Sequence, residues 1–288
     1  MKMKNDYTVR RETAADYREV ENLTREAFWN VYRPGCTEHY VLHRFRDRPE
    51  FVKELDLCLE VGGRIVGHVM FVRAEIKADD GRTLPIMTFG PISIHPDFQR
   101  KGYGKILLDF ALEKASEMGV GAVCMEGNID FYGKCGFDVA SKSGIHYYAE
   151  PREEFVPYFL LKQLRDGFLD GVTGVYKTPD GYFVDDSEAE AFDSQFPTKE
   201  KLKLPGQWYK TESPRRREKS ASGTLPSFFR YSQYLKKGAD SCPLPKSFSE
   251  LFIQGRGSSS LRNRKCSSRL RCRYCRLSLH RNGTLHHR

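Results

Sequence analysis

The sequence has no run of about 18 consecutive apolar residues, the length that a membrane-spanning helix needs. No apolar signal-peptide core follows the first six residues. These absences predict a protein with no membrane partner, and we expect a cytoplasmic location. The chain has 288 residues, of which 39% are hydrophobic, enough to bury the core of one large domain or two modest ones.

Cysteine is sparse and irregularly spaced. Eight cysteines are scattered along the chain, and Cys58, Cys124 and Cys135 lie inside apolar segments, so we predict reduced thiols and no disulfide framework. Cys272-x-x-Cys275 is followed by several histidines, which raises the question of zinc. A closed zinc site usually pairs two tight ligand clusters, and the second cluster is ragged here. We therefore predict no metal site.

Acidic residues are few in the last part of the chain. Residues 208–288 contain 19 lysines and arginines and 4 aspartates and glutamates, a net charge of +15. Residues 1–207 contain 28 lysines and arginines and 34 aspartates and glutamates, a net charge of −6, so the overall charge of +9 comes from the C-terminal segment. We expect no nucleic-acid binding by the folded part, while nonspecific binding by the Arg-rich segment is an alternative function.

The most informative stretch is a glycine loop at 99–105, between a β-rich run at 85–94 and an amphipathic helix predicted at 105–118. Gly102 and Gly104 allow a tight turn and leave no Cβ in the way. Successive N–H groups can then point at an anion at the start of the helix. The loop therefore predicts a cradle for a phosphate or pyrophosphate group.

Charge around the loop agrees with an anionic ligand. A helix N-terminus is worth about 0.3–2 kcal/mol to an anion placed there. Formal charge is added by Arg100, Lys101 and Lys105. The third glycine of the dinucleotide fingerprint G-x-G-x-x-G is replaced by Leu107, and the pattern G-x-x-x-x-G-K-[ST] is also absent. These differences disfavour NAD and ATP.

The loop resembles the Q/R-x-x-G-x-G/A signature of the GNAT superfamily of N-acetyltransferases, as Gln99-x-x-Gly102-x-Gly104. Three further segments match the family in the right order: the strand 92–94 followed by His95-Pro96, the strand 122–126, and Phe131 to Phe137, which is similar to the F-Y-x-x-x-G-F segment of many members. The resemblance covers roughly residues 5–150. It implies that loop amides hold the pyrophosphate of acetyl-CoA, the co-substrate.

The resemblance implies an α/β fold, in which a mixed, mostly antiparallel sheet is flanked by helices and its central strands splay apart. It divides the chain into an acetyltransferase domain at 1–150 and a C-terminal extension at 151–207 that packs on it, as in some stand-alone bacterial members. We expect the basic Ser/Arg-rich segment at 208–288 to be disordered. Its sequence is also compatible with a function of its own or with a shifted reading frame.

Local patterns predict the individual elements. Before residue 150 they indicate a helix at 17–28, strands at 7–10, 55–61, 65–72, 84–94 and 122–126, and a short helix at 130–134. The resemblance implies a further helix at about 38–45. After residue 150 the local patterns indicate a helix at 153–164, strands at 172–176 and 182–184, and a helix at 187–196. Gly90-Pro91 interrupts one strand, because proline donates no ladder hydrogen bond, and the sheet should loosen there.

The resemblance also implies positions for the cofactor. The pantetheine arm of acetyl-CoA lies between the splayed strands in this family and hydrogen-bonds to strand backbone. The implied contacts are Ile92, Ser93 and Ile94 for the arm, Gln99, Arg100, Lys101, Gly102, Tyr103, Gly104 and Lys105 for the pyrophosphate, and Asn128, which is otherwise a helix N-cap. Aromatic residues of the first two helices either line the acceptor pocket or belong to the core: Trp29, Tyr32, His39 and Tyr40.

The implied reaction is direct transfer of an acetyl group to a primary amine of a small molecule or peptide. At pH 7, deprotonation costs about 4.6 kcal/mol for an amine of pKa about 10.4 and about 1.4 kcal/mol for one of pKa about 8. The need for a base therefore depends on the acceptor. Candidate bases are Glu126 and His95, each acting through water, although His95 is alternatively a plain loop residue.

Tyr132 occupies the place of the family tyrosine that protonates or holds the leaving thiolate, and its alternative role is packing on the pantetheine. A coenzyme A-binding regulatory domain without turnover would show the same phosphate and pantetheine sites. That second class remains an alternative function at this stage.

Overall fold

The structure is a computed structural model, and it describes residues 7–205 and 207. The helices are α1 (Tyr17–Phe28), α2 (Glu38–Phe45), α3 (Tyr103–Glu117), α4 (Ile129–Tyr132) and α5 (Asp186–Asp193). The strands are β1 (Tyr7–Arg11), β2 (Leu57–Val61), β3 (Arg64–Ala78), β4 (Thr83–Ile94), β5 (Ala122–Glu126), β6 (Asp138–Val139), β7 (Ile145–Tyr147), β8 (Phe159–Gln163) and β9 (Gly174–Tyr176). Short 3-10 helices include Pro96–Phe98 and Asp180–Tyr182.

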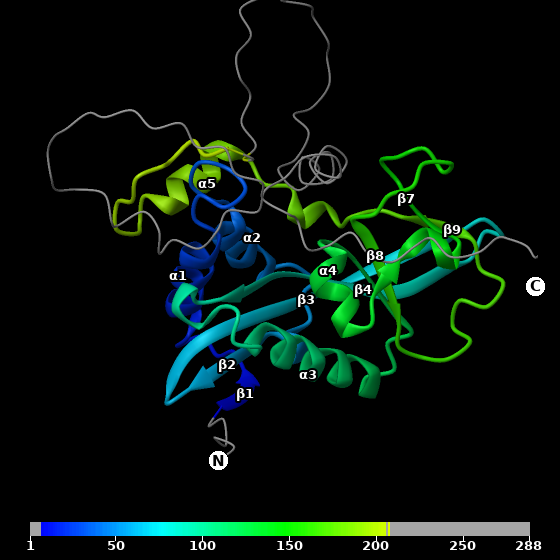
Figure 1. The fold of residues 1–288 in the computed structure, drawn as a ribbon, viewed down its shortest axis with the longest axis horizontal. Helices are drawn as coiled ribbons and strands as arrows, with labels where there is room; N and C mark the ends of the chain where they lie inside the picture. Colours follow the sequence, from blue (N-terminus) through cyan, green and yellow to red (C-terminus); the bar gives the residue numbers. More distant parts are fainter. Residues whose placement is uncertain (1–6, 206, 208–288) are drawn as a thin grey trace, which may run out of the picture. The chain divides into compact units, whose positions relative to one another are not determined.

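The strands form one mixed sheet. Its order is β1-β2-β3-β4-β5-β8-β6, with β9 paired to β3 and to β7. The pairs β4–β5 and β7–β9 are parallel, and the other pairs are antiparallel. Figure 1 shows α3 on one side of this sheet and α1, α2 and α5 on the other. The predicted α/β fold, with a mostly antiparallel sheet flanked by helices, is confirmed.

The central strands β4 and β5 separate as predicted. They pair only at Met87 and Val123, whereas β5 pairs with β8 along its whole length. The register between β3 and β4 also shifts at Gly90-Pro91, because Val69 pairs with Ile92 while Phe71 pairs with Phe89. The C-terminal half of β4 is therefore free of β5, which leaves backbone groups available between the two strands.

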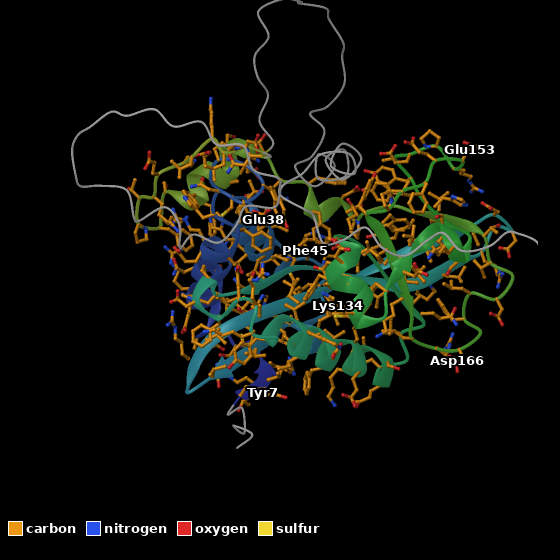
Figure 2. All side chains as sticks on the ribbon, in the orientation of Figure 1. Tyr7, Glu38, Phe45, Lys134, Glu153 and Asp166 are labelled. Carbon is orange, nitrogen blue, oxygen red and sulfur yellow. The ribbon has the colours of Figure 1, made fainter. Side chains whose placement is uncertain are left out.

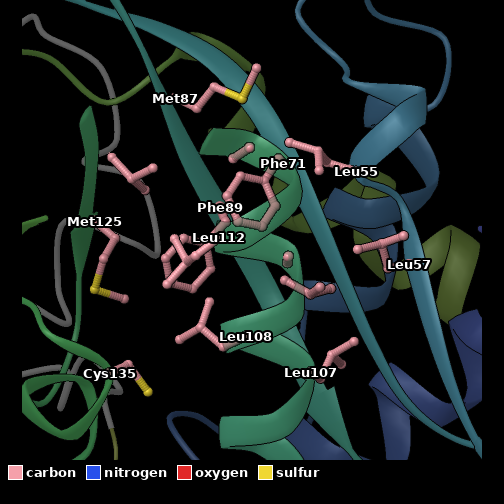
Figure 3. Close-up of a cluster of buried hydrophobic side chains, with 14 of the residues drawn as sticks. Leu55, Leu57, Phe71, Met87, Phe89, Leu107, Leu108, Leu112, Met125 and Cys135 are labelled. Carbon is pink, nitrogen blue, oxygen red and sulfur yellow. The ribbon is translucent and has the colours of Figure 1, made fainter. Parts of the chain in front are cut away.

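A hydrophobic cluster fixes α3 against the sheet. Leu107, Leu108 and Leu112 of α3 are buried against Phe89 and Met125 of the central strands (Figure 3). Each such side chain contributes roughly 1.5–3 kcal/mol when it is fully buried. The N-terminus of α3 is consequently held just beyond the end of β4.

A second set of buried side chains lies under α1 and α2. Phe45 of α2 packs on the opposite sheet face from α3, together with Met70 and Val72 of β3. Figure 2 shows Phe45 in the interior and Glu153 and Asp166 at the periphery. The thiols predicted to be reduced, those of Cys58, Cys124 and Cys135, are free and buried.

The segment after residue 150 joins the sheet. The predicted helix at 153–164 is wrong, because Phe159–Gln163 forms β8 and fills the place between β5 and β6. The predicted strand at 182–184 is also wrong, because a 3-10 helix ends at Tyr182, whose side chain is buried. The strand β9 and the helix α5 confirm the other two predictions with shorter bounds.

In the part of the chain that the structure describes, no helix has the length and apolar character needed to span a membrane. The basic segment 208–288, with Cys272 and Cys275, lies outside the described residues.

Candidate active site

The glycine loop leads from β4 into α3 and has the geometry of an anion cradle. Gly102 is the N-cap of α3, and its φ of +90° lies in the left-handed region that favours glycine. The first helical hydrogen bond runs from Ile106 N–H to the Gly102 carbonyl (3.1 Å). The N–H groups of Tyr103, Gly104 and Lys105 therefore have no acceptor within the helix. They form the positive end of the helix dipole.

The space in front of these amides is open on the glycine side. A Cβ placed on Gly102 would have no atom within 4 Å, and a Cβ on Gly104 would lie 3.4 Å from the ring of Phe131. The cradle is thus bounded on one side by the Phe131 ring from α4. This shape fits a phosphate group that approaches the helix end.

The polar side chains of the loop mostly stabilise the loop itself. Gln99 donates a hydrogen bond to the Ile94 carbonyl (3.0 Å), and Lys101 donates one to the Asp97 carbonyl (2.7 Å). Lys105 forms an ion pair with Asp109, one turn further along α3. Arg100 has a φ of +61°, an uncommon conformation for a residue with a side chain. The backbone N–H groups of this loop are therefore more available to an anion than Lys101 and Lys105 are.

The implied pantetheine positions lie on the free half of β4. Ile92 and Ile94 pack on the α3 side, while Ser93 is buried and donates a hydrogen bond to Thr24 of α1 (3.0 Å). A contact between Ser93 and a cofactor would therefore use its backbone. The Asn128 side chain accepts a hydrogen bond from Asp130 N–H (2.8 Å), so its N-cap role is present.

Tyr132 lies beside the end of β5 on the α3 side of the sheet. Its ring centroid is 5.8 Å from that of Phe89 on β4 and 6.0 Å from that of Phe137. A Cβ on Gly127 would lie only 2.4 Å from the Tyr132 ring, so the ring rests directly on the backbone that follows β5. Tyr132 is thus next to the separation of β4 and β5.

His95 is at the other end of that separation, next to the glycine loop. Its Nε2 lies 2.8 Å from Nη2 of Arg64, and its Nδ1 accepts a hydrogen bond from Asp97 N–H (3.3 Å). The imidazole is therefore engaged at the phosphate end of β4.

Glu126 is the last residue of β5, and its carboxyl group is buried. Its Oε1 accepts hydrogen bonds from the Tyr147 hydroxyl (2.8 Å) and the Thr178 hydroxyl (2.8 Å). Its Oε2 has no hydrogen-bond partner among the described residues. Burial raises the pKa of Glu126 to about 7, and the two hydrogen bonds oppose this rise. The carboxyl group can therefore bind and release a proton near neutral pH.

Glu126 and Tyr132 lie on opposite sides of the sheet at the end of β5. Tyr147, the partner of Glu126, packs with Cys124 and Tyr176 on the face away from α3, whereas Tyr132 packs with the α3 cluster. On the Glu126 side, the Tyr182 hydroxyl donates to the Gly90 carbonyl (3.1 Å). The separated strands thus have a candidate base on one face and a candidate acid on the other.

Three of the aromatic residues considered for the acceptor pocket or the core contact the C-terminal segment. His39 is fully buried, and its Nε2 lies 3.1 Å from Oδ1 of Asp193. The Tyr40 hydroxyl donates to Glu188 (3.0 Å), and the Trp29 indole donates to the Glu200 carbonyl (2.9 Å). These contacts fasten the segment around α5 to α1 and α2.

Another buried polar cluster lies beside β1, β2 and β3. Its members Glu12, Asp56 and His68 offer ligand atoms within 4.8 Å of one another, a spacing compatible with a metal ion. Both Glu12 oxygens, however, accept hydrogen bonds from Arg46, and His68 Nε2 lies 2.7 Å from Asp56. Burial raises the pKa of Glu12 to about 8 and lowers that of His68 to about 4. We interpret the cluster as a buried hydrogen-bond network.

Sequence reasoning missed Tyr147, Thr178 and Tyr182. Tyr147 is 21 residues and Thr178 is 52 residues from Glu126 in the chain. No motif or periodicity links such distant positions. Only the pairing of β7 with β9, and of β9 with β3, brings them to the end of β5.

The chain is similar to known proteins over its first half. Residues 17–137 match the profile described as the acetyltransferase (GNAT) family. The uncharacterized N-acetyltransferase YjhQ of Escherichia coli K12 is 31% identical over 85 residues, which are 29% of this chain and 46% of that protein. The uncharacterized N-acetyltransferase YhbS of the same strain is 25% identical over 113 residues, 39% of this chain and 64% of that protein. The matches thus span about half to two thirds of these relatives.

The fold is similar to that of a solved structure. A crystal structure of YhbS from Escherichia coli in complex with CoA superposes with a TM-score of 0.52 and 20% sequence identity, over 61% of this chain and 91% of that chain. The matched residues 17–137 contain the glycine loop, β5 and Tyr132. Residues 17–137 thus match the GNAT acetyltransferase family, and the chain has the fold of a GNAT family structure.

Proposed function

We propose that this protein transfers the acetyl group of acetyl-CoA to a primary amine by direct attack. The observation that carries the proposal is the arrangement at the end of β5. There a buried carboxyl group, Glu126, and a tyrosine, Tyr132, lie on opposite faces of two separated strands. The solved relative YhbS is described as a complex with CoA, which supports the same class of co-substrate here.

The residues of the loop and of β4 fit acetyl-CoA. The open space at Gly102 and the free N–H groups of the first turn of α3 would hold the pyrophosphate. The free backbone of Ile92 to Ile94 would bind the pantetheine arm as an added strand does. From Ile94 back to Gly90 is four residues, about 13 Å of extended chain, which leads from the phosphate end to the position of Glu126 and Tyr132.

Acetyl-CoA, when bound, supplies an acetyl group activated as a thioester. Glu126 takes a proton from the acceptor ammonium, directly or through water, and frees the nitrogen lone pair. The amine attacks the thioester carbonyl, the new C–N bond forms, and the C–S bond breaks. The attacking nitrogen loses its second proton to solvent as the amide forms. Tyr132 stabilises or protonates the departing thiolate. His95 lies at the phosphate end, so the proposal assigns the base to Glu126.

The test is thiol release from acetyl-CoA with a panel of polyamines, aminoglycosides, amino acids and peptides. With an alkylamine acceptor, Glu126→Gln should lower kcat/KM about 10²- to 10⁴-fold at pH 7 without weakening acetyl-CoA binding. An acceptor with a less basic amine should depend less on Glu126. Binding of acetyl-CoA with no thiol release across the panel would instead favour a regulatory coenzyme A-binding domain.

A further inference from the structure

We infer that Tyr147 and Thr178 are positioning residues for Glu126. Their hydroxyl groups hold one carboxylate oxygen and leave the other to accept the proton of the acceptor amine. The inference rests on the proposed function. Both residues lie beyond the matched region 17–137. The C-terminal part of the chain would thus complete the active site as well as the sheet.

The first support is geometric. Tyr147 belongs to β7, and Thr178 follows β9, the strand that pairs with β7 in parallel register. The two hydroxyl oxygens are 3.0 Å apart, and each lies 2.8 Å from the same oxygen, Oε1 of Glu126. All three side chains are buried. One β7–β9 unit therefore delivers both donors to one oxygen.

The second support is the count of hydrogen atoms. Each hydroxyl carries one hydrogen, so an ionised Glu126 can receive both on Oε1. Oε2 is buried and has no hydrogen-bond partner within the described residues. A buried carboxylate oxygen without a partner is costly in a purely structural site. It suits a group whose partner arrives with the substrate.

The third support is the electrostatic surroundings. The titratable groups that face Glu126 from the packed elements are Tyr147 and Tyr148 near β7, Tyr176 of β9, Tyr182 of the 3-10 helix and Cys124 of β5. Burial raises the pKa of each of these groups, so all stay neutral at pH 7. The proton affinity of Glu126 therefore depends on burial and on the two hydroxyl groups.

The test compares Tyr147→Phe and Thr178→Val with the wild-type chain in rate profiles against pH. Each substitution removes one donor to the ionised carboxylate, so the pKa of Glu126 should rise. The acidic limb of kcat/KM should move up by about 1–2 pH units, since a hydrogen bond to a charged group is worth about 1.5–3 kcal/mol. The KM for acetyl-CoA should stay unchanged. Infrared difference spectra, with Glu126→Gln as the reference, should show that the carboxyl band of Glu126 titrates at a pH that is higher by the same amount.

Two variants serve as controls. Tyr158→Phe removes a hydroxyl from the same aromatic cluster, but that hydroxyl donates to Glu150 (2.9 Å) and should leave the profile in place. Thr178→Ser keeps the hydroxyl donor, and its acidic limb should lie at the same pH as that of the wild-type chain. A purely structural role predicts lower melting temperatures with no movement of the limb.

The outcomes separate the inference from the proposed function. If Tyr147→Phe and Thr178→Val fold and their acidic limbs do not move, the inference is overturned. Loss of rate in Glu126→Gln would in that case still support Glu126 as the base. Full activity in Glu126→Gln would overturn both. Failure of both variants to fold, with Tyr158→Phe folded, would assign the two hydroxyls to stability and also overturn the inference.

Discussion

The glycine loop and the Glu126 cluster are two halves of one candidate site, and they are built in opposite ways. The loop is a contiguous stretch at 99–105, and its working groups are backbone amides at an exposed helix end. The Glu126 cluster is assembled from β5, β7 and the residues after β9, and its working groups are buried side chains. A contiguous backbone site can be recognised from sequence, whereas an assembled side-chain site depends on strand pairing.

The two halves also differ in their electrostatics. Charges at the loop lie close to water, and salt will screen their attraction for an anion. Within the described residues, the hydrogen-bond partners of Glu126 are two neutral hydroxyl groups, and burial dominates its proton affinity. Substitutions should therefore change cofactor affinity at the loop, and rate or pH dependence at the cluster.

The largest effect is expected at the loop itself. Gly102→Glu should abolish measurable acetyl-CoA binding in calorimetric titration, because the new carboxylate would enter the phosphate space and repel the anion. Gly104→Val should do the same by covering the free amides. Gly81→Glu is a matched control, since Gly81 also has a φ of +90° and open space around a Cβ. Equal loss of affinity in the control would show that backbone strain alone causes the effect.

A smaller but still large effect is expected at Tyr132, on the opposite face of the sheet from the Glu126 cluster. Tyr132→Phe should lower kcat about 10²- to 10⁴-fold with little change in acetyl-CoA affinity, because the ring still packs on Gly127 and only the hydroxyl is lost. The falling limb of the rate profile at high pH should disappear. Near-normal kcat with a confirmed acceptor would mean that the thiolate departs unaided.

The smallest effect is expected on stability. The pKa of Glu126 is raised from 4.5 to about 7 in the folded protein, so the folded state binds more protons than the unfolded state between these values. The protonated carboxyl group stabilises the folded state relative to the ionised one. This contribution to the free energy of unfolding is complete below pH 4.5 and is lost as the pH rises through about 7. Glu126→Gln cannot ionise, and its melting temperature relative to wild type should be roughly 10 °C higher at pH 8 than at pH 4.5.

Thermal unfolding at the two pH values measures this difference. Glu150→Gln, which alters the carboxylate that accepts from Tyr158 in the same region, is the control for the loss of a carboxylate. An identical melting difference at both pH values would contradict the raised pKa of Glu126.

Prediction from sequence succeeded where a local pattern set the secondary structure, and it failed where packing against distant segments set it. The helix at 17–28 follows from hydrophobic spacing and matches α1, and the helix at 38–45 that the family resemblance implied matches α2. The segment 153–164 contains a short apolar run that suits a helix or a buried strand equally, and the unpaired edge of β5 made it β8. Tyr182 likewise ended in a 3-10 helix, because its ring packs on Phe45 and its hydroxyl reaches Gly90.

By itself, the sequence determined the glycine turn at the start of α3 and the separation of β4 from β5. Glycine at 102 sets a left-handed N-cap, and Gly90-Pro91 breaks the ladder, and both effects act within a few residues of backbone. Only the tertiary structure decided the chemistry of Glu126. A carboxyl pKa depends on burial and on hydrogen-bond donors, and here both come from strands that lie far away in the chain and adjacent in the sheet.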